Sequence, residues 1–264
     1  MRAWFLLHGY MHCDRRWMLV GPDFATRQNT QPATTWYECP TMTVVIDHPE
    51  GPILFDTSCP RDWETRWEPS GIADTFPYDQ VDESEYLEPS LKRLGFSLDD
   101  FRWVILSHLH FDHAGNLGLF AGRQAELIVQ KAELDGANAL EGDFSGAFIK
   151  SDYQGVNFTT IEGDTKLLPG VELLLLPGHT WGTMGIHLAL PHSGHVIYTS
   201  DAISQAAQMA LRPVEPATNW SSLEWRSSVE RVRGIAERLN ANVVFGHDRD
   251  QIGKSVKIAP YVYD

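Results

Sequence analysis

The chain has 264 residues, of which 43% are hydrophobic and 21% are charged, the composition of a folded globular protein rather than a disordered one. Asp and Glu number 35 against 21 Lys and Arg, and the resulting net charge of -14 disfavours binding to nucleic acids and to anionic membranes. The three cysteines form no CxxC pair, so we expect neither a disulfide framework nor a thiolate zinc site.

The start of the chain predicts a strand rather than a targeting segment. Residues 1–8 contain too short an apolar run for a signal peptide, and no stretch approaches the ~20 apolar residues of a membrane-spanning helix. We therefore expect one domain over residues 1–264, a cytoplasmic location, and a monomer or homodimer with no nucleic-acid or membrane partner.

Short apolar runs bounded by Gly, Pro or Asp predict buried strands. In chain order these strands cover residues 4–9, 43–46, 53–55, 103–106, 126–129, 171–176, 196–198 and 243–245. Apolar residues at helical spacing predict helices over residues 83–94 and 221–239. Residues 56–82 and 137–158 lack periodicity and are expected to be long loops. The alternation of strands and helices predicts an α/β, layered αββα architecture.

Metal-ligating residue types crowd the segment after the expected strand 103–106. His108, His110, Asp112 and His113 lie within one short turn. Three imidazoles and a carboxylate are costly to bury so close together without a cation. His108 and His110 alternate on one side of an extended segment, while Asp112 and His113 on the next turn can face a second cation. Nitrogen and carboxylate ligands without a thiolate suit Zn, Mn, Fe or Co.

Three further candidate ligands each follow an expected strand: His179, Asp201 and His247. A carboxylate such as Asp201 is able to bridge two cations about 3.5–4 Å apart, as in two-metal hydrolases. Six isolated histidines are instead expected to be surface or hydrogen-bonded core residues: His8, His12, His48, His187, His192 and His195.

Other residues are candidates for supporting roles. For Trp63, Trp67 and Trp181 we expect core packing or loop anchoring, with the wall of an apolar substrate pocket as the alternative. Ser204 and Tyr153 are candidate hydrogen-bond donors to the ligands.

The chain resembles the metallo-β-lactamase superfamily in the order and spacing of its candidate ligands. The resemblance rests on HLHFDH at residues 108–113, PGH at 177–179, Asp201 and GHD at 246–248. The resemblance extends along nearly the whole chain and implies the four-layer αββα sandwich of that superfamily. It also implies that one metal ion is held by His108, His110 and His179, the other by Asp112, His113 and His247, with Asp201 bridging them. Residues 54–57 resemble the superfamily's strand-end aspartate motif, which implies that Asp56 braces the site without ligating a metal.

Within the superfamily, residues 4–9, 107–116 and 259–263 look most like the N-acyl-homoserine lactonase branch. This similarity implies two divalent cations, zinc first and Fe, Mn or Co otherwise. It further implies a hydroxide between the cations that opens a lactone ring, with Asp112 passing the proton to the leaving alkoxide. Lactonases of this branch usually have a tyrosine three residues after the bridging aspartate, where this chain has Ser204.

Other functions are compatible with the same scaffold. The first is another hydrolase, acting on an ester, thioester, phosphoester or β-lactam. A thioesterase of the glyoxalase II kind would be expected to have a basic C-terminal region, which residues 254–264 do not provide. A di-iron redox protein would need a flavin domain, for which the chain has no spare length, and a complete ligand set disfavours a non-catalytic metal-binding protein.

Overall fold

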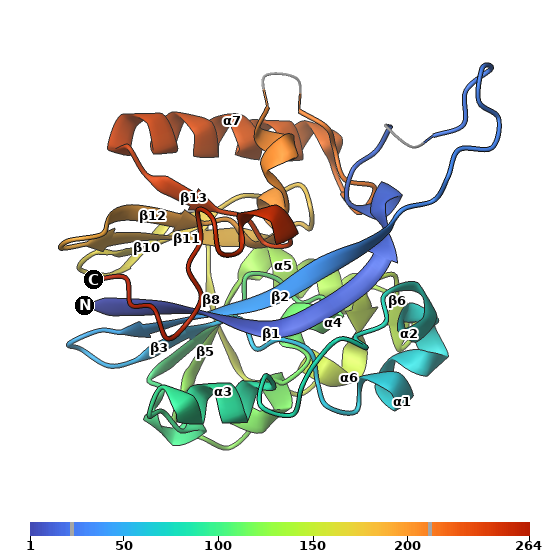
Figure 1. Ribbon diagram of the computed structural model, residues 1–264. Helices are drawn as coiled ribbons and strands as arrows, with labels where there is room; N and C mark the ends of the chain where they lie inside the picture. Colours follow the sequence, from blue (N-terminus) through green and yellow to red (C-terminus); the bar gives the residue numbers. More distant parts are fainter. Residues whose placement is uncertain (22–23, 211–212) are drawn as a thin grey trace.

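The computed structural model describes residues 1–21, 24–210 and 213–264. Two β-sheets face each other at its centre (Figure 1). The first sheet has the strand order β1-β2-β3-β4-β5-β8 and the second β13-β12-β11-β10-β9. The strands of the first sheet are β1 (Arg2–Asp14), β2 (Trp36–Asp47), β3 (Ile53–Phe55), β4 (Trp103–Ile105), β5 (Glu126–Gln130) and β8 (Phe158–Ile161). Those of the second are β9 (Thr165–Leu168), β10 (Val171–Leu175), β11 (Met184–Leu190), β12 (Gly194–Tyr198) and β13 (Asn242–Val244).

Helices cover the outer faces of both sheets. Figure 1 shows α7 over the second sheet and α3 on the far side of the first. The helices are α1 (Trp63–Trp67), α2 (Ile72–Thr75), α3 (Leu87–Arg93), α4 (Phe111–Ala114), α5 (Lys131–Ala139), α6 (Lys150–Tyr153) and α7 (Ser222–Leu239). A small separate ribbon pairs β6 (Phe144–Ser145) with β7 (Phe148–Ile149). The predicted αββα sandwich is confirmed.

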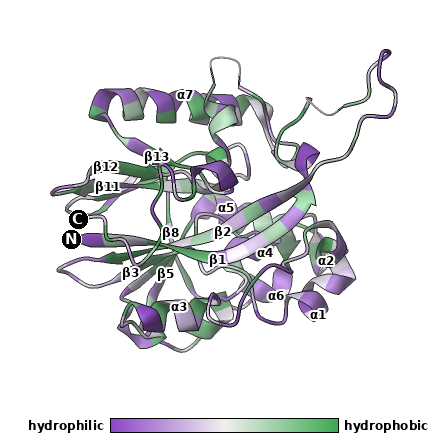
Figure 2. Ribbon diagram, in the orientation of Figure 1, coloured by the Kyte–Doolittle hydropathy of each residue, from purple (hydrophilic) through white to green (hydrophobic). Residues whose placement is uncertain are grey.

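Alternate side chains of the central strands enter different cores. Phe55 and Ile105 pack between the two sheets, whereas Leu54 and Val104 face the helices on the outer side of the first sheet. Because β3 and β4 are buried on both faces, their sequences are continuous apolar runs rather than alternating ones. Figure 2 shows hydrophobic residues concentrated on these inner strands and hydrophilic ones on the exposed side of α7.

The strand directions bring several carboxyl ends to one edge of the sandwich. In the first sheet β3, β4, β5 and β8 run parallel to one another, and in the second β12 runs parallel to β13. In open sheets, functional groups gather where such strands end. The segments that follow β4, β10, β12 and β13 contain all seven predicted ligands, with Asp112 and His113 in α4.

Helix boundaries follow local chemistry. The helix predicted over residues 221–239 is α7, and the side chain of its N-cap residue Ser221 accepts a hydrogen bond from the backbone of Glu224. The helix predicted from residue 83 begins only at Leu87. Pro89 explains the difference, because its ring would clash with the carbonyl of residue 85 if the helix extended back through it.

The structure corrects several other expectations. The two segments expected to be loops contain short helices, α1 and α2 in the first and α6 in the second, and α5 ends inside the second. Strands β8, β9 and β11 were not predicted. The first strand extends beyond residues 4–9 to Asp14 because it pairs along its length with β2, with an irregularity in register between Leu7 and Tyr10.

Two further expectations concern cysteines and membranes. Cys13, Cys39 and Cys59 are all buried and unpaired by disulfides. In the described ranges, no helix has both the length and the apolar character needed to cross a bilayer.

Candidate metal centre

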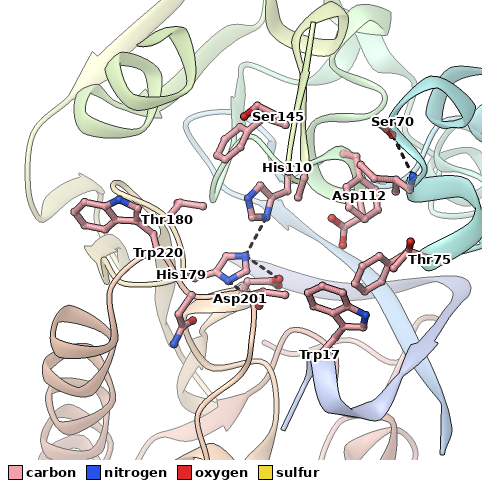
Figure 3. Close-up of a pocket in the computed structure, with 18 of the residues that line it drawn as sticks. Trp17, Ser70, Thr75, His110, Asp112, Ser145, His179, Thr180, Asp201 and Trp220 are labelled. Atoms are coloured by element: carbon pink, nitrogen blue, oxygen red, sulfur yellow. Dashed lines mark hydrogen bonds and ion pairs between the residues drawn. The ribbon is translucent and has the colours of Figure 1, made fainter. Parts of the chain in front are cut away.

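The seven predicted ligand side chains converge at the shared edge of the two sheets. Figure 3 shows His110, Asp112, His179 and Asp201 directed toward one another beside a pocket. All seven side chains are buried, with at most 8% of any residue exposed. Their nitrogen and oxygen atoms form three overlapping groups in which each ligand atom lies within 4.8 Å of the others.

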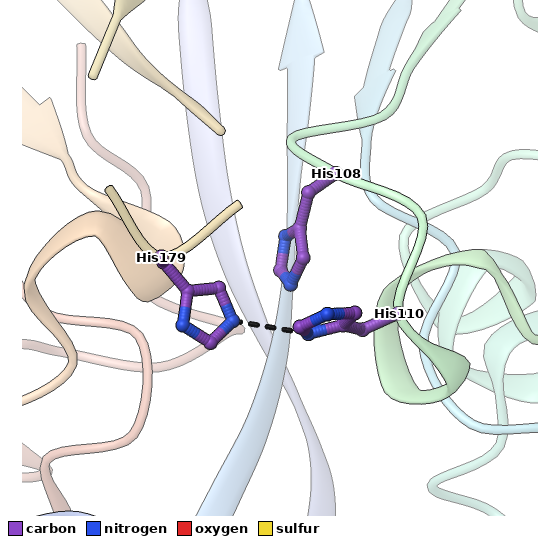
Figure 4. Close-up of side chains that lie close together, drawn as sticks. All are labelled: His108, His110 and His179. Atoms are coloured by element: carbon purple, nitrogen blue, oxygen red, sulfur yellow. Dashed lines mark hydrogen bonds between the residues drawn. The ribbon is translucent and has the colours of Figure 1, made fainter. Parts of the chain in front are cut away.

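The first cluster consists of His108, His110 and His179, whose rings converge in Figure 4. The Nδ1 atom of His110 lies 3.0 Å from Nε2 of His179. The Nε2 atom of His108 is buried and has no hydrogen-bond partner. Three nitrogen atoms therefore converge on one position.

The second cluster consists of Asp112, His113 and His247. Oδ2 of Asp112 lies 3.3 Å from Nε2 of His113 and 3.4 Å from Nε2 of His247. Asp201 lies between the two clusters, with Oδ1 3.0 Å from Nε2 of His247 and Oδ2 3.4 Å from Nε2 of His179. The two oxygens of one carboxylate thus face different clusters.

These distances fit cation ligands. Ligand atoms bound tetrahedrally at ~2.0–2.1 Å lie about 3.3 Å apart, close to the 3.0–3.4 Å separations of these atoms. Nε2 of His108, Nε2 of His113 and Oδ1 of Asp201 are buried without a hydrogen-bond partner. A buried polar atom without a partner is costly, and a bound cation would satisfy all three.

The electrostatics also suit positive charge. Burial lowers the pKa of His108, His110 and His179, so these imidazoles are neutral and their lone pairs are available. Burial also lowers the pKa of His247, but the carboxylates of Asp201 and Asp112 outweigh it and raise that pKa to about 10. The two carboxylates therefore create a negative potential at the second cluster, where a cation is stabilised.

Partners outside the clusters orient the imidazoles. Nδ1 of His113 lies 2.9 Å from Oδ2 of Asp56, and Nδ1 of His247 lies 2.9 Å from the carbonyl of Pro40. Nδ1 of His108 lies 3.0 Å from Oγ of Ser107. Since these acceptors fix the proton on Nδ1, they leave Nε2 free to ligate. Asp56, which the sequence predicts to brace the site without ligating a metal, thus contacts one candidate ligand and belongs to neither cluster.

Asp56 also ties two strand ends together. Its carboxylate accepts hydrogen bonds from the backbone and the hydroxyl of Ser107, at 2.7 and 2.8 Å. Asp56 follows β3 and Ser107 follows the neighbouring parallel strand β4. The carboxylate therefore sets where the segment with His108, His110, Asp112 and His113 leaves the sheet.

Two glycines allow the close packing of the ligand loops. A Cβ on Gly178, which has φ +132°, would lie 2.2 Å from the backbone nitrogen of Trp225 on α7. A Cβ on Gly246 would lie 2.6 Å from the carbonyl oxygen of Ser200 and 2.9 Å from Oδ1 of Asp201. Any larger residue at these positions would displace the loop that contains His179 or His247.

A cavity of about 560 Å³ opens onto both clusters. Its wall is mostly apolar, with smaller polar residues between. The apolar lining residues are Met11, Trp17, Met18, Ile72, Phe76, Phe111, Leu140, Ala147, Phe148, Trp181 and Trp220. Among the described residues that line the cavity there is no Lys or Arg, and the only carboxylates are the cluster residues Asp112 and Asp201. The cavity is suited to a neutral, apolar molecule.

The supporting residues predicted from sequence have different outcomes. Trp181 lines the cavity, whereas Trp63 and Trp67 pack in a separate core with Phe111. Tyr153 donates its hydroxyl proton to the carbonyl of Ala137 at 3.2 Å, so the expectation that it donates to a ligand is wrong.

Ser204 does line the cavity, and its backbone nitrogen and hydroxyl both bond to the side chain of Gln208. The described part of the chain places none of the six isolated histidines in a cluster. His8, for example, is buried between Thr43 and the carbonyl of Glu85.

Sequence reasoning missed most of the cavity wall. Trp17, Phe148 and Trp220 line it, yet they lie in irregular or very short elements where no periodicity singles them out. Glu133 was also missed. It is fully buried next to two ligand loops, and its position on a short helix gave no signal.

Comparison with known proteins agrees with this geometry. Residues 36–247 match the family model described as the metallo-beta-lactamase superfamily. An N-acyl homoserine lactonase from a Bacillus species is 34% identical over 219 residues, covering 81% of this chain and 83% of the relative. The N-acyl homoserine lactonase AiiB of Agrobacterium fabrum is 28% identical and covers 97% of this chain and 96% of its own length.

The fold is also similar to that of a solved structure. An N-acyl homoserine lactone hydrolase, with the product N-hexanoyl-L-homoserine bound at its catalytic metal centre, superposes with a TM-score of 0.81 and 28% identity. The match covers 99% of this chain and 98% of that one.

Proposed function

The chain belongs to the metallo-β-lactamase superfamily, and we propose that it is a dinuclear metal-dependent hydrolase that opens the ring of an N-acyl-homoserine lactone or a related lactone. The observation that supports this most is the pair of ligand clusters joined by Asp201 beside an apolar cavity. The lactonases among its relatives are consistent with the same reaction. Hydrolysis of such lactones would make it a quorum-quenching enzyme.

In this proposal seven side chains hold the metal. His108, His110 and His179 would hold one divalent cation and Asp112, His113 and His247 the other, with Asp201 between the two clusters as the residue able to contact both. Zinc is the metal we propose first, because nitrogen and carboxylate ligands at these separations suit it, and Fe, Mn or Co would use the same ligands. Two bound cations would lower the pKa of a water molecule toward about 7 and so supply hydroxide at neutral pH.

Asp112 is the residue we propose for proton transfer. Its carboxylate belongs to the second cluster and also lines the cavity. The side chains of His113 and His247 lower its pKa despite burial, so it is ionised and able to accept a proton from the attacking water. Delivery of that proton to the ring oxygen, as the acyl carbon–oxygen bond breaks, leaves one hydroxy acid as product.

The cavity wall selects the substrate. A lactone is neutral, and its acyl chain would lie against aromatic residues such as Trp181 and Trp220, whose ring centroids are 5.8 Å apart. A β-lactam with its carboxylate, or a glutathione thioester, is anionic and would be expected to need a cationic partner. The described lining residues offer no Lys or Arg for that purpose.

A hydrolysis panel with parallel metal analysis tests the proposal. The purified, metal-loaded protein is assayed with acyl-homoserine lactones of several chain lengths, simple γ-lactones, aryl esters, thioesters and nitrocefin. We expect turnover of lactones and two equivalents of metal by inductively coupled plasma analysis. Turnover confined to thioesters or nitrocefin would show that the substrate assignment is wrong.

A matched pair of variants tests the ligands. His110→Ala should lower the metal content and abolish most lactone turnover. His187→Ala serves as the control, because His187 is also buried and lies 2.9 Å from another histidine, His195, outside both clusters. Full metal occupancy in His110→Ala would refute its assignment as a ligand.

A further inference from the structure

Glu133 is a fully buried carboxylate for which the proposed reaction has no use. It lies in the first turn of α5, directly after β5, and none of its surface is exposed. It belongs to neither ligand cluster. A buried carboxylate is costly unless several donors compensate it, so its partners indicate what it does.

Those partners come from the two loops that form the first cluster. Oε1 of Glu133 accepts a hydrogen bond from the backbone nitrogen of Leu109, at 3.0 Å, and Leu109 lies between His108 and His110. Oε2 accepts from the hydroxyl of Thr180 at 2.5 Å and from the backbone nitrogen of Gly182 at 3.0 Å. One carboxylate therefore joins the loop of His108 and His110 to the loop of His179.

The hydroxyl of Thr180 is itself fixed. Its oxygen lies 2.6 Å from that of Thr183, and its backbone nitrogen donates to the same Thr183 oxygen at 2.9 Å. Because Thr180 has one hydroxyl proton and gives it to Glu133, the Thr183 hydroxyl donates to Thr180. The Thr183 hydroxyl thus donates to the Thr180 hydroxyl, which donates to Oε2 of Glu133.

The helix α5 packs closely against the His179 loop. A Cβ on Gly182 would lie 2.6 Å from the backbone nitrogen of Glu133, and a Cβ on Gly136 would lie 2.2 Å from the ring of Trp181. The helix therefore contacts the loop at two successive turns. Burial raises the pKa of Glu133, and the three donated hydrogen bonds act in the opposite sense.

We propose that Glu133 is a positioning residue that fixes the separation of His108 and His110 from His179, and thereby the affinity of the first cluster for its cation. The inference rests on the proposed function, since it concerns the metal site assigned there. Glu133 belongs to neither cluster and is not among the described residues that line the cavity, so it would act through the backbone of the two loops. Sliding one loop past the other would leave buried donors and the carboxylate unpaired, so the carboxylate makes the cluster rigid.

Glu133→Gln tests the proposal with little change in shape. The amide has one acceptor oxygen and one nitrogen with two N–H donors. Its nitrogen must therefore face other donors, either the backbone N–H of Leu109 or the hydroxyl of Thr180 and the backbone N–H of Gly182, and cannot accept from them. Cobalt(II) or zinc(II) titrations of the full chain against a competing chelator give the affinity of each step. His110→Ala identifies which step belongs to the first cluster.

We expect Glu133→Gln to weaken the first-cluster step by about 10–100-fold, the range found when a partner of a metal ligand is removed, and to leave the other step within about twofold. Tyr153→Phe is the matched control. It removes a hydrogen bond to Ala137 on the same helix without touching either ligand loop, and both metal affinities should be unchanged. A loss of stability in Glu133→Gln with both affinities unchanged would overturn the proposal.

If Glu133→Gln does not fold, Thr180→Val removes one of the three donors and is compared in the same way. The first-cluster step should again weaken, and an unchanged affinity there would overturn the proposal. Failure of the underlying function would look different. Wild-type protein would bind no metal or hydrolyse no lactone, whatever the effect of changing Glu133.

Discussion

Substitution of Asp56 tests whether its hydrogen bond to His113 is needed for the second cluster to bind metal. We consider Asp56→Asn, which preserves size and removes the charge. Asp56 has φ 64°, a left-handed conformation that asparagine also adopts readily, so the backbone introduces no new strain. Its Oδ1 accepts one hydrogen bond, from the Ser107 backbone, whereas Oδ2 accepts from the Ser107 hydroxyl and from His113.

The expected loss of stability and of metal affinity follows from how these donors are divided between Oδ1 and Oδ2. The amide loses least if its oxygen replaces Oδ2 and its nitrogen faces the Ser107 backbone N–H, which leaves at least that buried donor unsatisfied. That costs ~1–3 kcal/mol of folding free energy. His113 also loses a charged acceptor, and removing such a partner lowers metal affinity by about 10–100-fold, or about 1.4–2.7 kcal/mol.

The assay measures metal affinity by chelator competition and stability by urea unfolding. Asp47→Asn is the control, because Asp47 pairs with Arg2 at the surface, where their side chains are 32% and 58% exposed. An exposed pair contributes only ~0–1 kcal/mol. If Asp56→Asn is destabilised but binds both metal ions as tightly as wild type, the idea that Asp56 orients His113 for ligation is wrong.

Three further outcomes are expected. Ser204→Tyr should raise kcat for lactones about tenfold in steady-state assays, because a phenol would add a donor beside the substrate carbonyl; an unchanged kcat would count against this. Trp220→Ala should raise KM for long acyl chains but not short ones, since each buried CH₂ contributes ~0.8 kcal/mol; equal effects on both would exclude a chain-binding role. Burial raises the pKa of Asp152 from 3.8 to about 7 despite its pairing with Arg66. The folded state therefore holds a proton that the unfolded chain releases, and stability falls as pH rises through this window, by up to about 4 kcal/mol. Asp152→Asn should flatten that dependence in unfolding measured from pH 4 to 8.

The strands that build the site could be predicted because they are buried on both faces. Residues 53–55 are β3 as predicted, and 103–106 differ from β4 by one residue. In both, every side chain is buried, so the apolar run is unbroken. In contrast, β11 contains Gly185 and His187, and β8 is an edge strand with exposed threonines. Pairing with neighbouring strands determines both of them, β11 with β10 and β12 and β8 with β5, and their own sequences show no unbroken apolar run.

The seven candidate ligands were visible in the sequence because a metal site needs particular residue types at strand ends. The cavity wall was not visible, because an aromatic residue packs equally well in a core or on a pocket. Trp67 and Trp181 illustrate this: the first is fully buried against Phe111 and the second lines the cavity. Only the three-dimensional arrangement of the loops separates the two roles.

The central claim is that seven side chains hold a pair of cations. Anomalous diffraction from crystals of the zinc-reconstituted protein tests it directly. We expect two peaks about 3.5–4 Å apart, one within the first cluster and one within the second, with Asp201 between them. A single peak, or peaks away from these side chains, would contradict the account.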